Sequence, residues 1–177
     1  PIWIAGDSEA THRLAARHGY TPIITGRGSG PDYLSEMRAR IDSSYAAEGF
    51  STTNHPLGIL RFACVTESIS ETEAYLENVR YQLRLAGALR NRSEAMSQGM
   101  MVEAAIPGEL SLEELAKNLP VGDAETVAER LHADIKAAGA SHVMLNIQAG
   151  ASTMALARRT IDTFSSDIRP AIERALN

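Results

Sequence analysis

The sequence is organised around four short apolar segments rich in strand-forming residues, with amphipathic helical patterns between them. The segments are residues 1–5 (PIWIA), 22–25 (PIIT), 57–66 (LGILRFACVT) and 142–148 (HVMLNIQ). The first, second and fourth are apolar almost throughout, which is typical of strands covered on both faces of a parallel sheet. Strands that alternate with helices imply right-handed βαβ crossovers, so the chain is predicted to be α/β with a parallel sheet.

Capping residues predict where the intervening helices begin and end. Ser8 is expected to cap a helix that runs to His18, with Gly19 just past its C-terminus. Pro170 is expected to kink the last helix, because proline removes a backbone hydrogen bond. Further helix starts are predicted at two capping boxes and one N-cap, namely Ser70 with Glu73, Ser111 with Glu114, and Asp123, whose helix ends before Gly139.

Two architectures satisfy this order of elements, open doubly wound sheets and (β/α)₈ barrels, and periodicity alone does not separate them. The least regular stretch is residues 91–110, which contains Gly99, Pro107 and Gly108. It reads as an excursion from the α/β pattern. Such an excursion can carry a lid or binding loop, or can be a plain connection.

Composition excludes several classes of function. The 177 residues suffice for one domain with its own core. The net charge of -5 and the lack of a basic stripe argue against a nucleic-acid partner. No apolar run reaches the ~20 residues of a membrane helix, and no signal peptide is visible. The single cysteine, Cys64, fits a reducing cytoplasm, and the five histidines show no metal-ligand spacing.

The strongest local signal for function is the junction of the first strand and first helix, residues 5–11 (AGDSEAT). Gly6 permits a tight turn, so free backbone N–H groups and the helix dipole are directed at one point. The hydroxyls of Ser8 and Thr11 can face the same side, which predicts an anion site suited to a phosphate. The Asp7 carboxylate would repel a phosphate, so it must turn away or contribute through its backbone. An ordinary N-cap after a strand would use the same residues.

Residues 1–24 (PIWIAGDSEATHRLAARHGYTPII) resemble the segment of luciferase-like, flavin-dependent monooxygenases that holds the flavin phosphate. Gly6, Asp7, Ser8 and Thr11 match the positions that cradle the phosphate of FMN in that family. Other stretches agree in the same order, namely residues 121–131 (VGDAETVAERL), 145–148 (LNIQ) and 167–172 (DIRPAI). The resemblance therefore spans most of the chain, although residues 91–110 match nothing in the family.

This resemblance implies that the chain, one domain over residues 1–177, is the C-terminal half of a (β/α)₈ barrel and holds its last four β/α units. Active sites of such barrels lie at the C-terminal ends of the strands. Residues 6–11, 25–30 and the regions after Thr66 and Gln148 are therefore expected on one rim.

The glycine-rich loop of residues 25–30 (TGRGSG) supplies further candidate cofactor-binding residues, Thr25, Gly26 and Arg27. Its glycines allow close backbone approach or a moving lid. Arg27 can neutralise an anion or lie near the flavin ring. The alternative is a flexible connection that ends at Pro31, the first helical residue.

The resemblance also implies a monooxygenase that receives reduced FMN from a separate flavin reductase and oxidises a small organic substrate with O₂. No catalytic residue is assigned, because the family's polar residues near the flavin ring come largely from the first four strands. A deazaflavin-dependent oxidoreductase of the same superfamily is an alternative, although the Ser/Thr-rich turn favours FMN.

A third possibility is a non-catalytic, flavin-binding half-barrel. The chain begins at Pro1 inside a strand-like run, and four strands leave open edges at the first and the fourth. Open edges invite pairing, so a homo-oligomer, most simply a dimer, is expected. The isolated chain is expected to have little or no monooxygenase activity.

Overall fold

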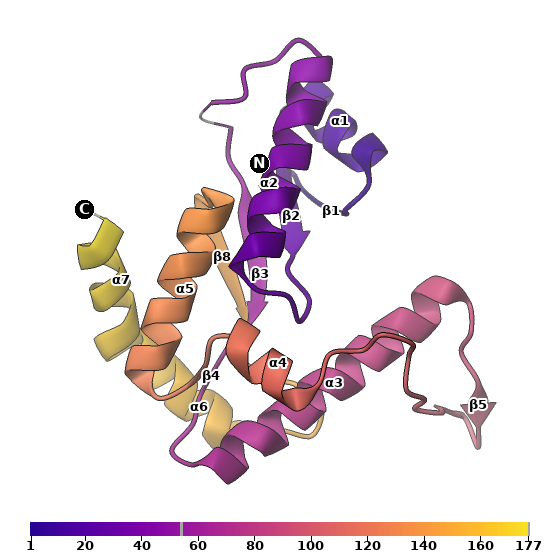
Figure 1. The fold of residues 1–177 in the computed structure, drawn as a ribbon, viewed down its shortest axis with the longest axis vertical. Coiled ribbons are helices and arrows are strands. Elements are labelled where there is room, and N and C mark those ends of the chain that lie inside the picture. The colour runs from indigo at the N-terminus through magenta and orange to yellow at the C-terminus, as the bar shows by residue number, and fades with distance from the viewer. Residues whose placement is uncertain (54, 177) are drawn as a thin grey trace.

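A computed structural model describes residues 1–53 and 55–176 (Figure 1). Its main sheet has four strands in the order β1-β2-β3-β8, all parallel. They are β1 (Trp3–Ala5), β2 (Thr21–Thr25), β3 (Gly58–Phe62) and β8 (His142–Asn146). The predicted α/β fold with a parallel sheet is confirmed, and β1 and β8 form the two edges, as expected.

Seven α-helices are assigned in the described residues, with short strands at the periphery. The helices are α1 (Glu9–His18), α2 (Pro31–Ala47), α3 (Ile69–Asn91), α4 (Leu112–Asn118), α5 (Ala124–Ala138), α6 (Met154–Thr163) and α7 (Arg169–Leu176). The short strands are β4 (Cys64–Val65) with β7 (Val121–Gly122), and β5 (Met96–Ser97) with β6 (Met100–Met101). Within the described ranges, no helix is both long and apolar enough to cross a bilayer.

The predicted third segment, residues 57–66, is two strands rather than one. β3 ends at Phe62, and the chain then leaves the main sheet to pair as β4 with β7. The change of partner is visible in the backbone, since the N–H of Ala63 still donates to Asn146 O of β8, whereas the N–H of Cys64 donates to Pro120 O. The excursion of residues 91–110 contains the β5–β6 hairpin.

Most predicted helix caps are confirmed. The Ser8 side chain accepts a hydrogen bond from the N–H of Thr11, and Gly19 ends α1 in a left-handed conformation. Ser111 and Glu114 form the expected capping box, and Asp123 and Gly139 bound α5. The capping box at Ser70 and Glu73 is wrong, because α3 begins at Ile69 and its N-cap is Ser68, which accepts from the N–H of Glu71.

The last helical segment is interrupted, as the proline predicts, but the interruption begins before it. Residues Phe164–Ile168 form a π-helical turn between α6 and α7, and the N–H of Arg169 donates to Phe164 O. A proline ring clashes with the carbonyl four residues before it, here Ser166. The wider turn accommodates Pro170 where an α-helical ladder would be broken.

The two faces of the main sheet differ in burial. Ile24, Ile59 and Arg61 are fully buried on the face that the helices cover, whereas Leu60 and Phe62, which alternate with them on β3, are only half-buried. Successive side chains of a strand point to opposite faces. One face of the sheet is therefore the core, and the other is an open, mainly apolar surface.

The sheet curves strongly toward this open face. The rings of Trp3 and His142 lie 4.8 Å apart between centroids, although β1 and β8 are opposite edges of the sheet. Gly58 of β3 makes this contact possible, because a Cβ atom there would lie 3.0 Å from Trp3 Cζ3. Such curvature is what the wall of a closed barrel requires.

Candidate functional site

The turn between β1 and α1, residues 6–11 (the β1–α1 turn), follows the C-terminal end of an edge strand. A Cβ atom at Gly6 would lie 2.9 Å from Thr11 Oγ1, so a glycine is needed for the chain to pass this close to the helix. Ser8 Oγ accepts from the N–H of Thr11 at 3.2 Å and lies 2.8 Å from Thr11 Oγ1. The two hydroxyls therefore do share one side of the first helical turn.

The β1–α1 turn has free hydrogen-bond donors, and both of its carboxylates are paired with arginines. Glu9 and Ala10 are the first residues of α1, so their N–H groups have no acceptor inside the helix. The Glu9 carboxylate accepts from Arg13 Nε at 2.9 Å, one turn along the helix. Asp7 Oδ2 accepts from Arg27 Nη2 at 2.5 Å. Both acidic side chains of the turn are thus paired with arginines.

Arg27 belongs to the loop that follows β2, residues 26–30 (the rim loop), and its pairing with Asp7 joins the ends of β1 and β2. Its backbone is left-handed, with φ 50°. The glycines beside it serve close packing. A Cβ atom at Gly26 would lie 2.1 Å from Arg61 Nη1, and one at Gly28 would lie 2.5 Å from Leu115 Cδ2. Thr25 ends β2 and is half-buried.

Sequence reasoning missed Arg61, which holds the rim loop from below. It is fully buried on β3, and its Nε donates to Asp134 Oδ2 of α5 at 2.8 Å. Its Nη2 donates to the backbone carbonyls of Ser29 and Asn118, at 2.8 and 2.9 Å. Burial raises the pKa of Asp134 to about 6, in spite of the guanidinium beside it. The available signal was a single arginine inside an apolar strand.

His12, which the sequence did not single out, lies beneath the β1–α1 turn. Its ring is buried, and Nε2 lies 3.0 Å from the carbonyl oxygen of Gly6, to which it donates. Burial lowers the pKa of His12, although the Gly6 carbonyl and Asp7 act in the opposite direction. A neutral ring that donates from Nε2 therefore holds Gly6 in position.

The other predicted rim segments lie together at the first turns of α3. Thr66 Oγ1 is 2.7 Å from Thr72 Oγ1, and the N–H of Ala151 donates to Asn78 Oδ1 at 2.7 Å. The segments that follow β4 and β8 therefore converge on one helix. Figure 1 shows the strands running toward α3 and α4 at this end of the sheet.

A cavity of about 440 Å³ opens at the same end (the strand-end cavity). Leu60 and Phe62 of β3 and Leu83 of α3 give it an apolar lining, and Thr25 and Arg27 connect it to the rim loop. The cavity is thus contiguous, through Arg27, with the β1–α1 turn. Ligand pockets for small molecules are commonly of this size and this mixed lining.

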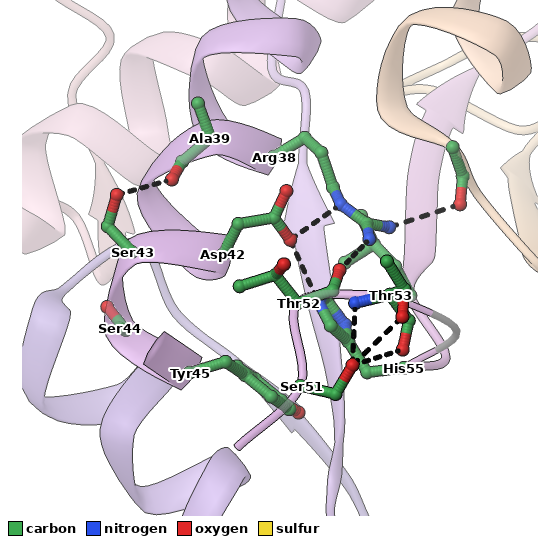
Figure 2. Close-up of polar contacts among 12 residues, drawn as sticks. Arg38, Ala39, Asp42, Ser43, Ser44, Tyr45, Ser51, Thr52, Thr53 and His55 are labelled. Carbon is green, nitrogen blue, oxygen red and sulfur yellow. Dashed lines mark hydrogen bonds and ion pairs between the residues drawn. The ribbon is translucent and has the colours of Figure 1, made fainter. Parts of the chain in front are cut away.

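Figure 2 shows a second histidine, His55, among polar groups where the chain enters β3, at the other end of the sheet. His55 Nε2 lies 2.7 Å from Asp42 Oδ1, and its ring stacks on Tyr45 with centroids 4.1 Å apart. Arg38 donates to Asp42 and to the carbonyl of Thr52. Polar clusters at the N-terminal end of barrel strands serve stability, so this one is set apart from the site.

Comparisons with known proteins identify the family of the chain and one relative. Residues 1–142 match the family described as luciferase-like monooxygenase. The uncharacterized protein y4vJ of Sinorhizobium fredii (strain NBRC 101917 / NGR234) is 29% identical over 177 residues, which cover 99% of this chain and 50% of that protein.

Three solved structures share the fold. Monooxygenase RslO1 from Streptomyces bottropensis has a TM-score of 0.65 at 16% identity, over 96% of this chain and 47% of its own. The oxygenating constituent of 3,6-diketocamphane monooxygenase from Pseudomonas putida, in complex with FMN, has a TM-score of 0.65 at 19% identity, over 96% of this chain and 48% of its own. An F420-dependent secondary alcohol dehydrogenase, in complex with an F420-acetone adduct, has a TM-score of 0.65 at 16% identity, over 97% of this chain and 48% of its own.

The chain spans about half the length of these relatives, and its fold is part of a (β/α)₈ barrel. The match to the family covers four fifths of the sequence. The chain belongs to the luciferase-like monooxygenase family of oxidoreductases.

Proposed function

We propose that this chain forms the phosphate-binding half of a monooxygenase that uses reduced FMN and O₂ to oxidise a small organic substrate. The observation that carries the proposal is the β1–α1 turn, where the hydroxyls of Ser8 and Thr11 and the free N–H groups of Glu9 and Ala10 meet. A related fold, 3,6-diketocamphane monooxygenase, was solved in complex with FMN.

The donor set of the turn fits a phosphate. Hydroxyl and backbone N–H groups at a helix N-terminus are the usual partners of phosphate oxygens, and the helix dipole favours the negative charge. Pairing of Asp7 with Arg27 and of Glu9 with Arg13 reduces the repulsion that these carboxylates would otherwise exert. Arg27 thereby neutralises a charge at the edge of the site.

The protein's part in the reaction is to bind and orient the flavin and to exclude water, while FMN supplies the oxidation chemistry. Ser8 and Thr11 would hold the phosphate, His12 and Arg61 would keep the turn and the rim loop in place, and the strand-end cavity would receive the substrate. Reduced FMN would come from a separate flavin reductase. Burial raises the pKa of the Cys64 thiol to about 11, so this cysteine is expected to stay an unreactive core residue.

The combined substitution Ser8→Ala with Thr11→Ala tests the site directly. Loss of both hydroxyls is expected to weaken FMN binding about tenfold or more, since hydrogen bonds to a charged group are each worth roughly 1.5–3 kcal/mol. The measurement is an FMN fluorescence titration, made anaerobically for the reduced cofactor. The matched control is Ser43→Ala, whose hydroxyl is exposed on α2 and donates to Ala39 O. Unchanged FMN affinity of the double variant would remove the site.

A deazaflavin-dependent hydride transfer is the second candidate, because an F420-dependent dehydrogenase shares the fold with the same TM-score of 0.65 as the FMN complex. Oxygen uptake during turnover separates the two reactions. Consumption of O₂ that depends on substrate supports the monooxygenase, whereas anaerobic turnover with a reduced deazaflavin supports the dehydrogenase.

A further inference from the structure

We propose that the strand-end cavity binds an organic anion, a molecule with an apolar body and a carboxylate or sulfonate group. The proposal rests on the proposed function, because it names the substrate class of the same site. Its basis is the meeting of an arginine-bearing face of α3 with the apolar end of β3 across one partly open cavity.

One face of α3 supplies most of the charge. Arg80, Leu83, Arg84, Gly87 and Arg90 recur at spacings of three and four residues, which places them on the same side of a helix. All five line the cavity. Here this face of α3 borders a partly open cavity between the sheet and a neighbouring loop, with Arg80 and Arg84 half-buried and Arg90 exposed at its edge.

That loop, residues 103–110, is held against α3 by ion pairs that occupy Arg84. Arg84 donates to both carboxylate oxygens of Glu109, at 2.8 and 2.5 Å, and to Glu103 at 2.5 Å. Gly87 is buried where the loop touches the helix, and a Cβ atom there would lie 3.2 Å from Ile106 Cδ1. Arg84 therefore holds the loop against α3, and Arg80 and Arg90 are the arginines of α3 left to bind a ligand.

The remaining cations are less compensated. Arg80 pairs with Glu77, one turn away and about half exposed, and Arg90 has no carboxylate partner in the described part of the chain. Of the charged residues that line the cavity, Arg27, Arg80, Arg84 and Arg90 are positive and Glu109 alone is negative. A guanidinium group matches a carboxylate or sulfonate in shape and donor geometry.

The rest of the lining suits the apolar part of such a molecule. Leu60, Phe62, Leu83, Ile106 and Leu110 surround a space of about 440 Å³, which is large enough for a small organic molecule. Arg27 lines this space and also pairs with Asp7 of the β1–α1 turn. An anion held there would lie one side chain away from the proposed cofactor phosphate.

The test compares octanoate with 1-octanol, which share a carbon skeleton and differ in charge, by isothermal titration of the full chain. Octanoate is expected to bind saturably and 1-octanol at least about tenfold more weakly. The double variant Arg80→Gln with Arg90→Gln should lose about tenfold in octanoate affinity and keep its FMN affinity. The charge-retaining pair Arg80→Lys with Arg90→Lys should retain part of the octanoate affinity, which separates loss of charge from misfolding.

The control is Arg169→Gln, which removes one positive charge from an exposed position of α7, away from the cavity. It should change neither affinity. No octanoate binding, equal binding of 1-octanol, or an unaffected double variant would overturn the proposal while FMN binding still supported the proposed function. Loss of FMN binding together with octanoate in the double variant would assign the arginines to the cofactor and also overturn it. Failure of the unmodified chain to bind FMN would instead refute the proposed function.

Discussion

Arg61 shows how one side chain far from the solvent can shape a site at the surface. Its buried ion pair with Asp134 spans 73 residues of sequence, and its other hydrogen bonds reach the rim loop and α4. Nothing local in the sequence specifies these partners. The strand pattern predicted that position 61 lies in a strand, but not that a charge would be tolerated on the buried face.

Substitution of Arg61 by alanine is expected to cost about 3–5 kcal/mol of unfolding free energy, because it leaves Asp134 buried without its partner. Urea unfolding followed by circular dichroism measures the change. Arg40→Ala is the control, since its ion pair with Glu36 is exposed and is worth about 1 kcal/mol or less. Equal losses in the two variants would show that the Arg61 pair does not support the fold.

His12 is expected to make the stability of the fold depend on pH, with stability falling as the pH falls. Because burial lowers its pKa below 6.5, the folded chain keeps the ring neutral at a pH where the unfolded chain begins to take up a proton. Its contribution is complete above pH 6.5 and is lost as pH falls through the folded-state pKa. Protonation would also disturb the neighbourhood of Gly6.

His12→Gln is the matching variant, since a glutamine amide can donate to the Gly6 carbonyl and does not titrate. Unfolding free energies at pH 7.5 and pH 5.5 should differ more for the unmodified chain than for the variant. Urea titrations at the two values measure the difference. Parallel pH dependences in the two proteins would mean that His12 does not carry the effect.

At the scale of elements, the accuracy of prediction follows the range of the interaction. The caps at Ser8, Ser111 and Asp123 are decided within three residues, and the sequence predicted them. The start of α3 was ambiguous in the sequence because two overlapping Ser-x-x-Glu patterns fit it, and Ser68 of the earlier one is the observed cap. Glu71 of the earlier pattern pairs with Arg159, 88 residues away.

The same reasoning applies to the site. The Ser8–Thr11 hydroxyls could be predicted from their spacing, whereas the pairing of Asp7 with Arg27 depends on the juxtaposition of two strand ends. The break between β3 and β4 likewise depends on β7, which joins them from residue 121. Local patterns therefore predicted the elements and the turn, and the contacts between elements had to come from the structure.

The start of α3 offers a direct comparison of two serines. Ser68→Ala is expected to cost about 0.5–2 kcal/mol of unfolding free energy, because it removes the acceptor for the N–H of Glu71. Ser70→Ala, the matched control on the same turn, should stay within about 0.5 kcal/mol. Chemical denaturation of both variants measures the two losses of unfolding free energy. A larger loss for Ser70→Ala would identify Ser70 as the N-cap, as the sequence predicted.

In the molecule as a whole, the two faces of the curved sheet differ, because only the outer face is covered by helices. Helices bury the outer face, whereas Leu60, Phe62 and Met144 of the inner face remain half-buried. Relatives twice as long as this chain share its fold over about half of their length. In a closed barrel these side chains would face the interior, with Leu60 and Phe62 bordering the strand-end cavity at its C-terminal end.

This open face predicts how the 177-residue polypeptide behaves in solution. The edge strands β1 and β8 have unpaired backbone groups, and Ile2 beside β1 is 59% exposed, so edge pairing and apolar burial both favour association. Sedimentation velocity is expected to give about twice the chain mass of 19.1 kDa. Met144→Lys, which places a charge on the inner face of β8, should shift the population toward monomer, whereas Ser43→Ala on the outer helix α2 should not. A well-folded monomer of 19.1 kDa at micromolar concentration would show that the open face does not drive self-association.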